Sequence, residues 1–230
     1  MDAIGKLRSR NVTAPGAVKG RHPAMATLGF TRDDFGVFRI EDFSARMNEI
    51  YARIRPRLLR LGAQLAPELG RKLQLEFFPH VATHARRAVN PPPETWAAFG
   101  PSPKGYKRYG YLALCISRAG LQARAVVKSE ADGRVQMADE IVARADDLQR
   151  SWRGTRIGRY DDWDFGTLPE EVPASAELLT RLSTSLRQRT GGIDLGFGWP
   201  PSQASRLDRA ELLDAFRELE PLYRILRSMG

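Results

Sequence analysis

The sequence YLALCISRAGLQARAVVK, residues 111–128, predicts the β-hairpin that decides the fold. Two apolar runs, about 110–117 and 121–128, are separated by a short Arg-Ala-Gly connection. A connection this short requires antiparallel pairing, and its glycine suits a tight turn. In the second run, Leu121, Ala123, Ala125 and Val127 alternate with Gln122, Arg124, Val126 and Lys128. We therefore expect one face of this strand to be buried and the other to be partly solvated.

Further strands and helices are expected on both sides of the hairpin. Strands are expected at about 74–81 and 94–99, with shorter candidates at 34–40, 155–163 and 193–199. Apolar residues at steps of three and four predict helices at about 43–69, 134–152, 175–188 and 208–226. Because the strands cluster instead of alternating with helices, the sequence predicts a single α+β domain. Its mainly antiparallel sheet would pack against helices as a two-layer sandwich.

The ends and interruptions of the helices can also be predicted. Asp42, Ser175 and Asp208 stand at the places of N-terminal caps. Pro56 and Pro67 fall inside the first helix, where each removes a backbone donor. We therefore expect two or three helical segments there.

The ordered domain is expected to cover residues 29–230. Residues 1–28 lack periodicity and predict either a disordered basic tail or a misassigned start, with translation beginning at Met25. They hold no apolar core of a secretory signal, and no stretch of the chain is long and apolar enough to cross a bilayer. The one cysteine, Cys115, allows no internal disulfide and no cysteine-based zinc site within one chain, and its apolar neighbours predict burial. These features suit a cytoplasmic protein without a membrane partner.

The charge of the chain favours anionic partners. Lys and Arg number 36 against 27 Asp and Glu, giving a net charge of +9. Such an excess is typical of proteins that bind nucleic acid or phosphorylated molecules.

The stretch HVATHARRAVNPPP, residues 80–93, gathers residues that can hold an anion. Arg86 and Arg87 carry guanidinium groups that match phosphate or carboxylate. Asn90 precedes Pro91, which favours an extended backbone, and the proline run stiffens the segment. His80 and His84 could share a metal on a helix, but two ligands make an incomplete site, and Val81 stands where a metalloprotease needs glutamate. No metal site is therefore expected.

Aromatic and basic residues continue beyond this stretch. Trp96 and Phe99 suit a core, although Trp96 could also serve as a platform for a ligand. Lys104–Lys107 form a basic turn beside an aromatic ring, which could close over a phosphate or be solvated. Only Glu94 opposes the positive residues of this region, which are His80, His84, Arg86, Arg87, Lys104, Lys107 and Arg108.

The block FFPHVATHARRAVNPPPETWAAFGPSPKGYKRYGYLAL, residues 77–114, resembles the YktB-like family of bacterial proteins of unknown function. Residues 34–58 resemble the start of that family, so the likeness extends from about Phe30 to Lys128 and continues loosely beyond. The resemblance implies a single α+β domain, of a two-layer kind similar to the biotin-ligase and class II synthetase topology. It implies no activity, because the family has no established catalytic residues to carry over. The matching positions are His80, His84, Arg86, Arg87, Asn90, Pro91, Pro92, Thr95, Trp96, Phe99, Gly105, Tyr106 and Lys107.

Three hypotheses remain open at this point. The leading hypothesis is a non-enzymatic domain that binds an anionic small molecule or nucleic-acid phosphate through His80, His84, Arg86, Arg87, Asn90, Trp96 and Lys107. The second is an enzyme in which His80 or His84 is a general base, oriented by an acid of Tyr160–Asp164. The third is a purely structural block, and the acids at 160–164 could simply pair with its arginines. No phosphate loop or other cofactor motif is present, so no cofactor is expected.

Overall fold

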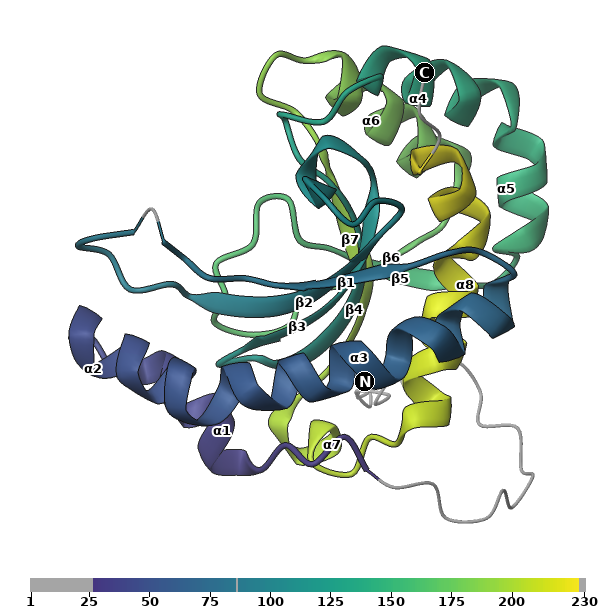
Figure 1. The fold of residues 1–230 in the computed structure, drawn as a ribbon. Coiled ribbons are helices and arrows are strands. Elements are labelled where there is room, and N and C mark those ends of the chain that lie inside the picture. The colour runs from purple at the N-terminus through teal and green to yellow at the C-terminus, as the bar shows by residue number, and fades with distance from the viewer. Residues whose placement is uncertain (1–26, 86, 228–230) are drawn as a thin grey trace, which may run out of the picture.

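The computed structural model describes residues 27–85 and 87–227, which form one α+β domain (Figure 1). Seven strands make one sheet in the order β1-β2-β3-β4-β7-β5-β6, and every strand pair in the described residues is antiparallel. The predicted α+β class with an antiparallel sheet against helices is therefore confirmed. The strands are β1 Phe78–Val81, β2 Glu94–Gly100, β3 Tyr111–Ser117, β4 Gly120–Val127, β5 Arg156–Arg159, β6 Glu171–Pro173 and β7 Ile193–Trp199.

The hairpin predicted from residues 111–128 lies at the centre of this sheet. Tyr111 pairs with Val126 and Ser117 with Gly120, so the turn consists of the two residues between β3 and β4. Gly120 has φ +126°, and a Cβ atom there would lie 1.9 Å from the carbonyl oxygen of Trp199. The glycine is therefore required both by the turn and by the close approach of β7.

Helices cover one face of the sheet. The long helices α3 and α8 pack against β1 to β4 and β7, and the central strands direct Leu112, Leu114 and Leu121 into the same core (Figure 1). The helices are α1 Arg32–Gly36, α2 Phe43–Glu49, α3 Arg55–Leu73, α4 Arg134–Ala143, α5 Ala145–Ser151, α6 Ala176–Arg187, α7 Pro201–Ala204 and α8 Arg209–Leu226. Three shorter turns are η1 Val37–Arg39, the π-helical η2 Ile50–Ile54 and η3 Tyr106–Arg108.

The predicted caps are present. The side chains of Asp42, Ser175 and Asp208 accept backbone hydrogen bonds from Ala45, Leu178 and Glu211 at the starts of α2, α6 and α8. Each satisfies an amide that the first helical turn leaves without a partner.

The strand predicted at 34–40 is wrong, because this segment forms α1 and η1. Apolar residues alternate in this segment as they do in a strand, but the polar Asp34 is buried as well. Its carboxylate accepts hydrogen bonds from the amide and hydroxyl of Thr31, and it pairs with Arg53 and Arg57. This local cap favours a helical turn over an extended strand.

The first helix is interrupted once. The π-turn η2 separates α2 from α3 just before Pro56, where the amide of Arg55 donates to the carbonyl of Ile50. Because proline has no backbone N–H to donate, the backbone hydrogen bonds of a helix readily shift from the α pattern to the π pattern at such a point. The two helices α2 and α3 agree with the two or three segments expected, and α3 continues through Pro67. A shorter break at Arg144 divides the helix predicted at 134–152 into α4 and α5.

The prediction that one face of β4 would be partly solvated is also wrong. Every residue of β4 is buried, including Gln122 and Arg124. The segment 160–168 lies over this second face: the ring of Tyr160 lies 5.0 Å from the Arg124 guanidinium, and a Cβ on Gly198 would lie 2.6 Å from Leu168.

Residues 1–26 lie outside the described residues, so the predicted tail stays a prediction. Within the described part, Thr27 forms a bridge with Asp208, and the amide of Leu28 donates to the carbonyl of Leu207.

Candidate functional site

The block at 80–109 lies at one edge of the sheet. Its first part leaves β1, crosses to β2 as a long connection that extends beyond the strands, and lies near α2 (Figure 1). Its second part connects β2 to β3 and contains η3. His84 of the first connection and Tyr106 of the second both contact Trp96 on β2.

Arg46 of α2 anchors the first connection. Its guanidinium donates from Nε to the carbonyl of Ile40 (2.6 Å) and from Nη1 to the carbonyl of Pro92 (3.0 Å). The hydroxyl of Tyr51 donates to the carbonyl of Thr83 (2.8 Å). Arg46 is only 8% exposed, and burial is the main cause that lowers its pKa. The proline-rich segment is therefore held by side chains of the neighbouring helical segments as well as by its own stiffness.

His84 is the best-defined member of the site. Its backbone has φ +53°, in the left-handed region that few residues other than glycine adopt. Its carbonyl accepts from the amide of Arg87 (2.9 Å), so the chain turns sharply here. The ring nitrogen Nε2 lies 3.0 Å from the hydroxyl of Thr95, and the ring lies edge-on to Trp96 with 5.5 Å between centroids. Both contacts fix the imidazole on β2.

A chain of rings joins the two connections. The indole nitrogen of Trp96 donates to the hydroxyl of Tyr106 (3.1 Å), and the ring of Tyr106 stacks on His80 at 5.0 Å. His80 also places Nε2 3.0 Å from the carbonyl oxygen of Ser102. Tyr106 precedes Lys107, so these contacts fix the end of the basic turn Lys104–Lys107 beside His80 and Trp96.

The charges of Arg87 and Lys107 act together on His84. Burial, followed by the positive charges of Arg87 and Lys107, lowers its pKa to about 4. The imidazole is therefore neutral at pH 7, and two cations from separate connections lie close enough to affect it.

Most other charges of the block are already neutralised or lie elsewhere. Arg108 pairs with Asp132 at 2.6 Å. The one described hydrogen bond of the Arg87 guanidinium goes to the carbonyl of Asn90 (3.4 Å), not to an acid. Asn90 is exposed and contributes that carbonyl, while Arg86 lies outside the described residues.

The predicted acid partners of the block do not lie there. Asp161 pairs with Arg159 (2.6 Å), and Asp164 accepts from the amide of Gly166 (2.7 Å). The described hydrogen bonds of both imidazoles go to a carbonyl and a hydroxyl, so neither has the carboxylate partner that the enzyme hypothesis requires. A base with a pKa of about 4 is also poorly matched to catalysis at neutral pH.

His80 and His84 do not face a common point. The first stacks on Tyr106 and the second lies against Trp96. In the described ranges, no group of three or more His, Cys, Asp or Glu side chains is arranged to hold a metal ion. None of the helices described there is long and apolar enough to cross a membrane.

The aromatic residues divide between the two faces of β2. Phe99 is completely buried in the core beneath the helices, as expected. Trp96 is half-buried on the opposite face, packed against a small cluster that includes Tyr111 and Cys115. It is therefore placed where its ring can border the site.

A buried charge cluster on this second face was not predicted. The Arg124 guanidinium, 2% exposed, pairs with Glu94 and with Asp194 (3.3 Å), and its Nε donates to the sulfur of Cys115 (3.1 Å). Glu94 thus faces Arg124, instead of opposing the cations of the block. The one available signal was an arginine at an alternating position of an otherwise apolar strand.

The cluster is closed by aromatic rings and by burial. The Arg124 guanidinium lies over the rings of Tyr160 (5.0 Å) and Trp163 (5.9 Å). Burial raises the pKa of Glu94 and raises the pKa of the Cys115 thiol to about 12. Cys115 is therefore a buried thiol, as expected, and its protonated form is favoured.

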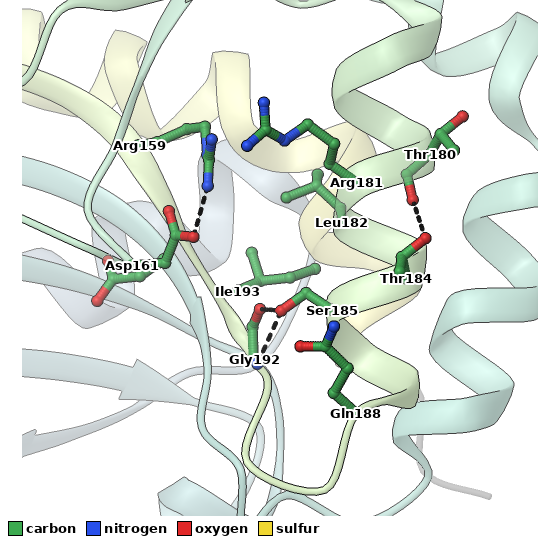
Figure 2. Close-up of a pocket in the computed structure, with 11 residues that line it drawn as sticks. Arg159, Asp161, Thr180, Arg181, Leu182, Thr184, Ser185, Gln188, Gly192 and Ile193 are labelled. Carbon is green, nitrogen blue, oxygen red and sulfur yellow. Dashed lines mark hydrogen bonds and ion pairs between the residues drawn. The ribbon is translucent and has the colours of Figure 1, made fainter.

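A hollow of about 330 Å³ lies beside this cluster, between β5, β7 and α6 (Figure 2). Figure 2 shows that many of its polar groups already contact one another. Arg159 pairs with Asp161, the hydroxyl of Thr184 donates to the carbonyl of Thr180, and the hydroxyl of Ser185 donates to the carbonyl of Gly192. The hollow therefore offers few free groups to a ligand, and no residue of the block lines it.

Comparison with known proteins identifies the family. Residues 30–223 match the family described as "Domain of unknown function (DUF1054)". The chain belongs to the DUF1054 family. Among DUF1054 relatives, a "UPF0637 protein" of Bacillus mycoides is 47% identical over 203 residues, which are 86% of this chain and 98% of the relative. A "UPF0637 protein" of Lysinibacillus sphaericus is 31% identical over 207 residues, 88% of this chain and 97% of the relative.

These matches confirm the resemblance to the YktB-like proteins of unknown function. A third DUF1054 relative, from Bacillus velezensis, is 27% identical over 210 residues, 90% of this chain and 100% of the relative. The DUF1054 description and the names of these relatives state no activity. The function must therefore be argued from the site.

Proposed function

We propose that this protein binds phosphate-bearing ligands at the surface formed by His84, Arg87, Asn90 and Lys107. Arg87 and Lys107 would contact the phosphate, and His84 and Asn90 would orient it. His80 and Trp96 would support this surface from β1 and β2, and the prediction for Arg86 lies outside the described residues.

The observation that carries the proposal is that the charges of Arg87 and Lys107 both act on His84 while no described carboxylate pairs with either. Arg87 and Lys107 come from different connections. Like charges brought together cost free energy unless an anion joins them. A phosphate supplies the charge and several acceptor oxygens for a guanidinium and an ammonium group.

The shape of the surface favours the phosphates of an extended molecule. The side chains of Arg87, Asn90 and Lys107 are exposed, and the half-buried rings of Trp96 and Tyr106 lie beside them. Nucleic-acid sites commonly combine an exposed line of cations with aromatic side chains on which bases stack. The net charge of +9 would further attract such a polyanion.

Binding to a fluorescent single-stranded oligonucleotide tests the proposal. We expect the double substitution Arg87→Gln and Lys107→Gln to weaken binding at least about tenfold, because two phosphate contacts are lost. The matched control is Arg60→Gln with Arg71→Gln, which removes the same net charge from exposed positions of α3. Equal losses in the two double variants would contradict a site at the block.

A second arm separates a polymer from a small molecule. Affinity for the oligonucleotide should fall steeply with salt, and excess inorganic pyrophosphate should compete only weakly. If pyrophosphate binds as tightly as the oligonucleotide, and the same two substitutions weaken it equally, the ligand is a small phosphate compound. If neither probe binds, the proposed function is wrong.

A further inference from the structure

A second hollow, of about 380 Å³, has three arginines among its seven lining residues. Arg32 and Asp33 come from α1, Arg39 from η1 and Arg118 from the turn between β3 and β4. Phe35 and Pro201 also line it. Three separate segments, namely residues 32–39, the turn between β3 and β4, and α7, therefore contribute to one small space.

The positive charges of this hollow exceed the negative ones. Of the two acids of α1, Asp34 is 1% exposed and is already paired with Arg53 and Arg57, which leaves Asp33 as the only acid among the lining residues. In the described part of the chain, neither Arg32 nor Arg39 has an acidic partner. The described hydrogen bond of Arg118 goes from Nε to the carbonyl of Phe165 (2.9 Å).

The excess of positive charge also affects the neighbouring Arg46. The charge of Arg118 lowers the pKa of Arg46, after the larger effect of burial. Arg46 itself donates to carbonyl groups and not to an acid. Arg32, Arg39 and Arg118 therefore meet at this hollow without a described ion pair, and Asp33 is the acid of the same lining.

The lining also has an apolar part. Phe35 is 3% exposed and belongs to the main core, and Pro201 begins α7. A volume of about 380 Å³ lies within the range of small-molecule sites, which are largely apolar with a few polar groups that fix the ligand. A bare inorganic anion would leave the apolar part of such a space unused.

We propose that this hollow binds a small organic anion, whose acidic group contacts Arg32, Arg39 and Arg118 and whose apolar body packs against Phe35 and Pro201. A phosphate or carboxylate accepts charge-assisted hydrogen bonds from more than one guanidinium. Asp33, which is also part of the lining, limits the negative charge that the site tolerates and so favours small anions over polyanions. The site shares no residue with the phosphate-binding surface at His84 and is independent of it.

Phenyl phosphate is a suitable probe, because it combines an anionic group with a compact ring. Isothermal titration should show saturable binding of phenyl phosphate that is tighter than binding of inorganic phosphate, while phenol should not bind. The substitutions Arg32→Gln and Arg39→Gln together should weaken phenyl phosphate at least about tenfold. Both side chains are exposed, so these substitutions should leave the thermal unfolding midpoint unchanged.

Two control variants make the outcome decisive. Arg60→Gln with Arg71→Gln removes the same charge from α3 and should leave the affinity for phenyl phosphate within about twofold. Arg87→Gln with Lys107→Gln should also leave it unchanged, even if it abolishes oligonucleotide binding. Absence of saturable binding, an equal loss in the Arg60 and Arg71 control, or a loss confined to the Arg87 and Lys107 variant would each overturn the proposal.

Discussion

The guanidinium of Arg124 on β4 pairs with the carboxylate of Glu94 on β2, although β3 lies between these two strands. The arginine side chain crosses β3 at Cys115, to which its Nε donates a hydrogen bond. Asp194 on β7 binds the same guanidinium from the other side. A single buried side chain therefore links four consecutive strands on the face opposite the helices.

Replacing Arg124 should destabilise the protein strongly. Arg124→Met would leave Glu94 and Asp194 partly buried near each other with only Lys128, 3.5 Å from Asp194, to compensate. Removing one partner of a buried ion pair costs about 3–5 kcal/mol. Urea unfolding should show a loss of this size, whereas Arg124→Met combined with Glu94→Gln should lose less. A single variant as stable as the wild type would show that the cluster is not maintained in solution.

Gly198 should be required for the segment 160–168 to cover this cluster. A Cβ atom at Gly198 would lie 2.6 Å from Leu168 and 2.7 Å from the hydroxyl of Tyr160. Gly198→Ala should therefore displace the rings of Tyr160 and Trp163 from Arg124 and speed alkylation of the native Cys115 thiol. The wild-type thiol should react slowly because it is buried and its pKa is raised to about 12. Unchanged alkylation in Gly198→Ala would mean that another route limits access.

Arg46 should hold the proline-rich connection in place. Arg46→Met keeps much of the side-chain volume but removes the donors to Ile40 and Pro92, so the connection should open more often. Trypsin cleavage after Arg87 should then be several-fold faster than in the wild type. Arg53→Met, on the adjacent π-turn but in contact with Asp34 and Glu49, is the matched control and should not increase cleavage there.

Stability should fall in acid because His84 is neutral in the folded protein. The pKa of His84 is about 4 when folded and about 6.5 when unfolded, so the unfolded state binds more protons between these values. The free energy of unfolding should therefore decrease as pH falls from 6.5 to 4. Because the ring is partly exposed, we expect a contribution of only about 1–2 kcal/mol.

The variant His84→Asn isolates this effect from the titration of carboxylates. Asparagine tolerates the left-handed backbone at this position, but it does not titrate. Its stability should vary less between pH 4 and 6.5 than that of the wild type. Parallel pH curves for the two proteins would argue that His84 is solvated and unperturbed.

The fold could be predicted from sequence where patterns are local. The central hairpin, the four strands from β1 to β4 and the caps at Asp42, Ser175 and Asp208 follow from alternation, turn residues and side-chain acceptors. The segment 34–40 was not predicted, because its apolar alternation hid both the local cap between Thr31 and Asp34 and the burial of Asp34 against Arg53 of η2 and Arg57 of α3.

The site was predictable only in part for a similar reason. The clustering of His80, His84, Arg87, Trp96 and Lys107 near one another could be inferred from their closeness in sequence. The second face of β4 could not, because its burial depends on residues 160–168, whose contact with Arg124 is set by the sheet order β4-β7-β5. Residues that form an ion pair but lie far apart in the sequence cannot be recognised as partners from the sequence around either one.

The pKa of His84, measured by NMR from its imidazole proton shifts, tests the central claim most directly. The claim is that Arg87 and Lys107 converge on this imidazole and form one positive surface. It predicts a pKa of about 4 in the wild type, and a higher pKa both in Arg87→Gln with Lys107→Gln and in the wild type saturated with oligonucleotide. A pKa near 6.5 that neither the substitutions nor the oligonucleotide changes would contradict it.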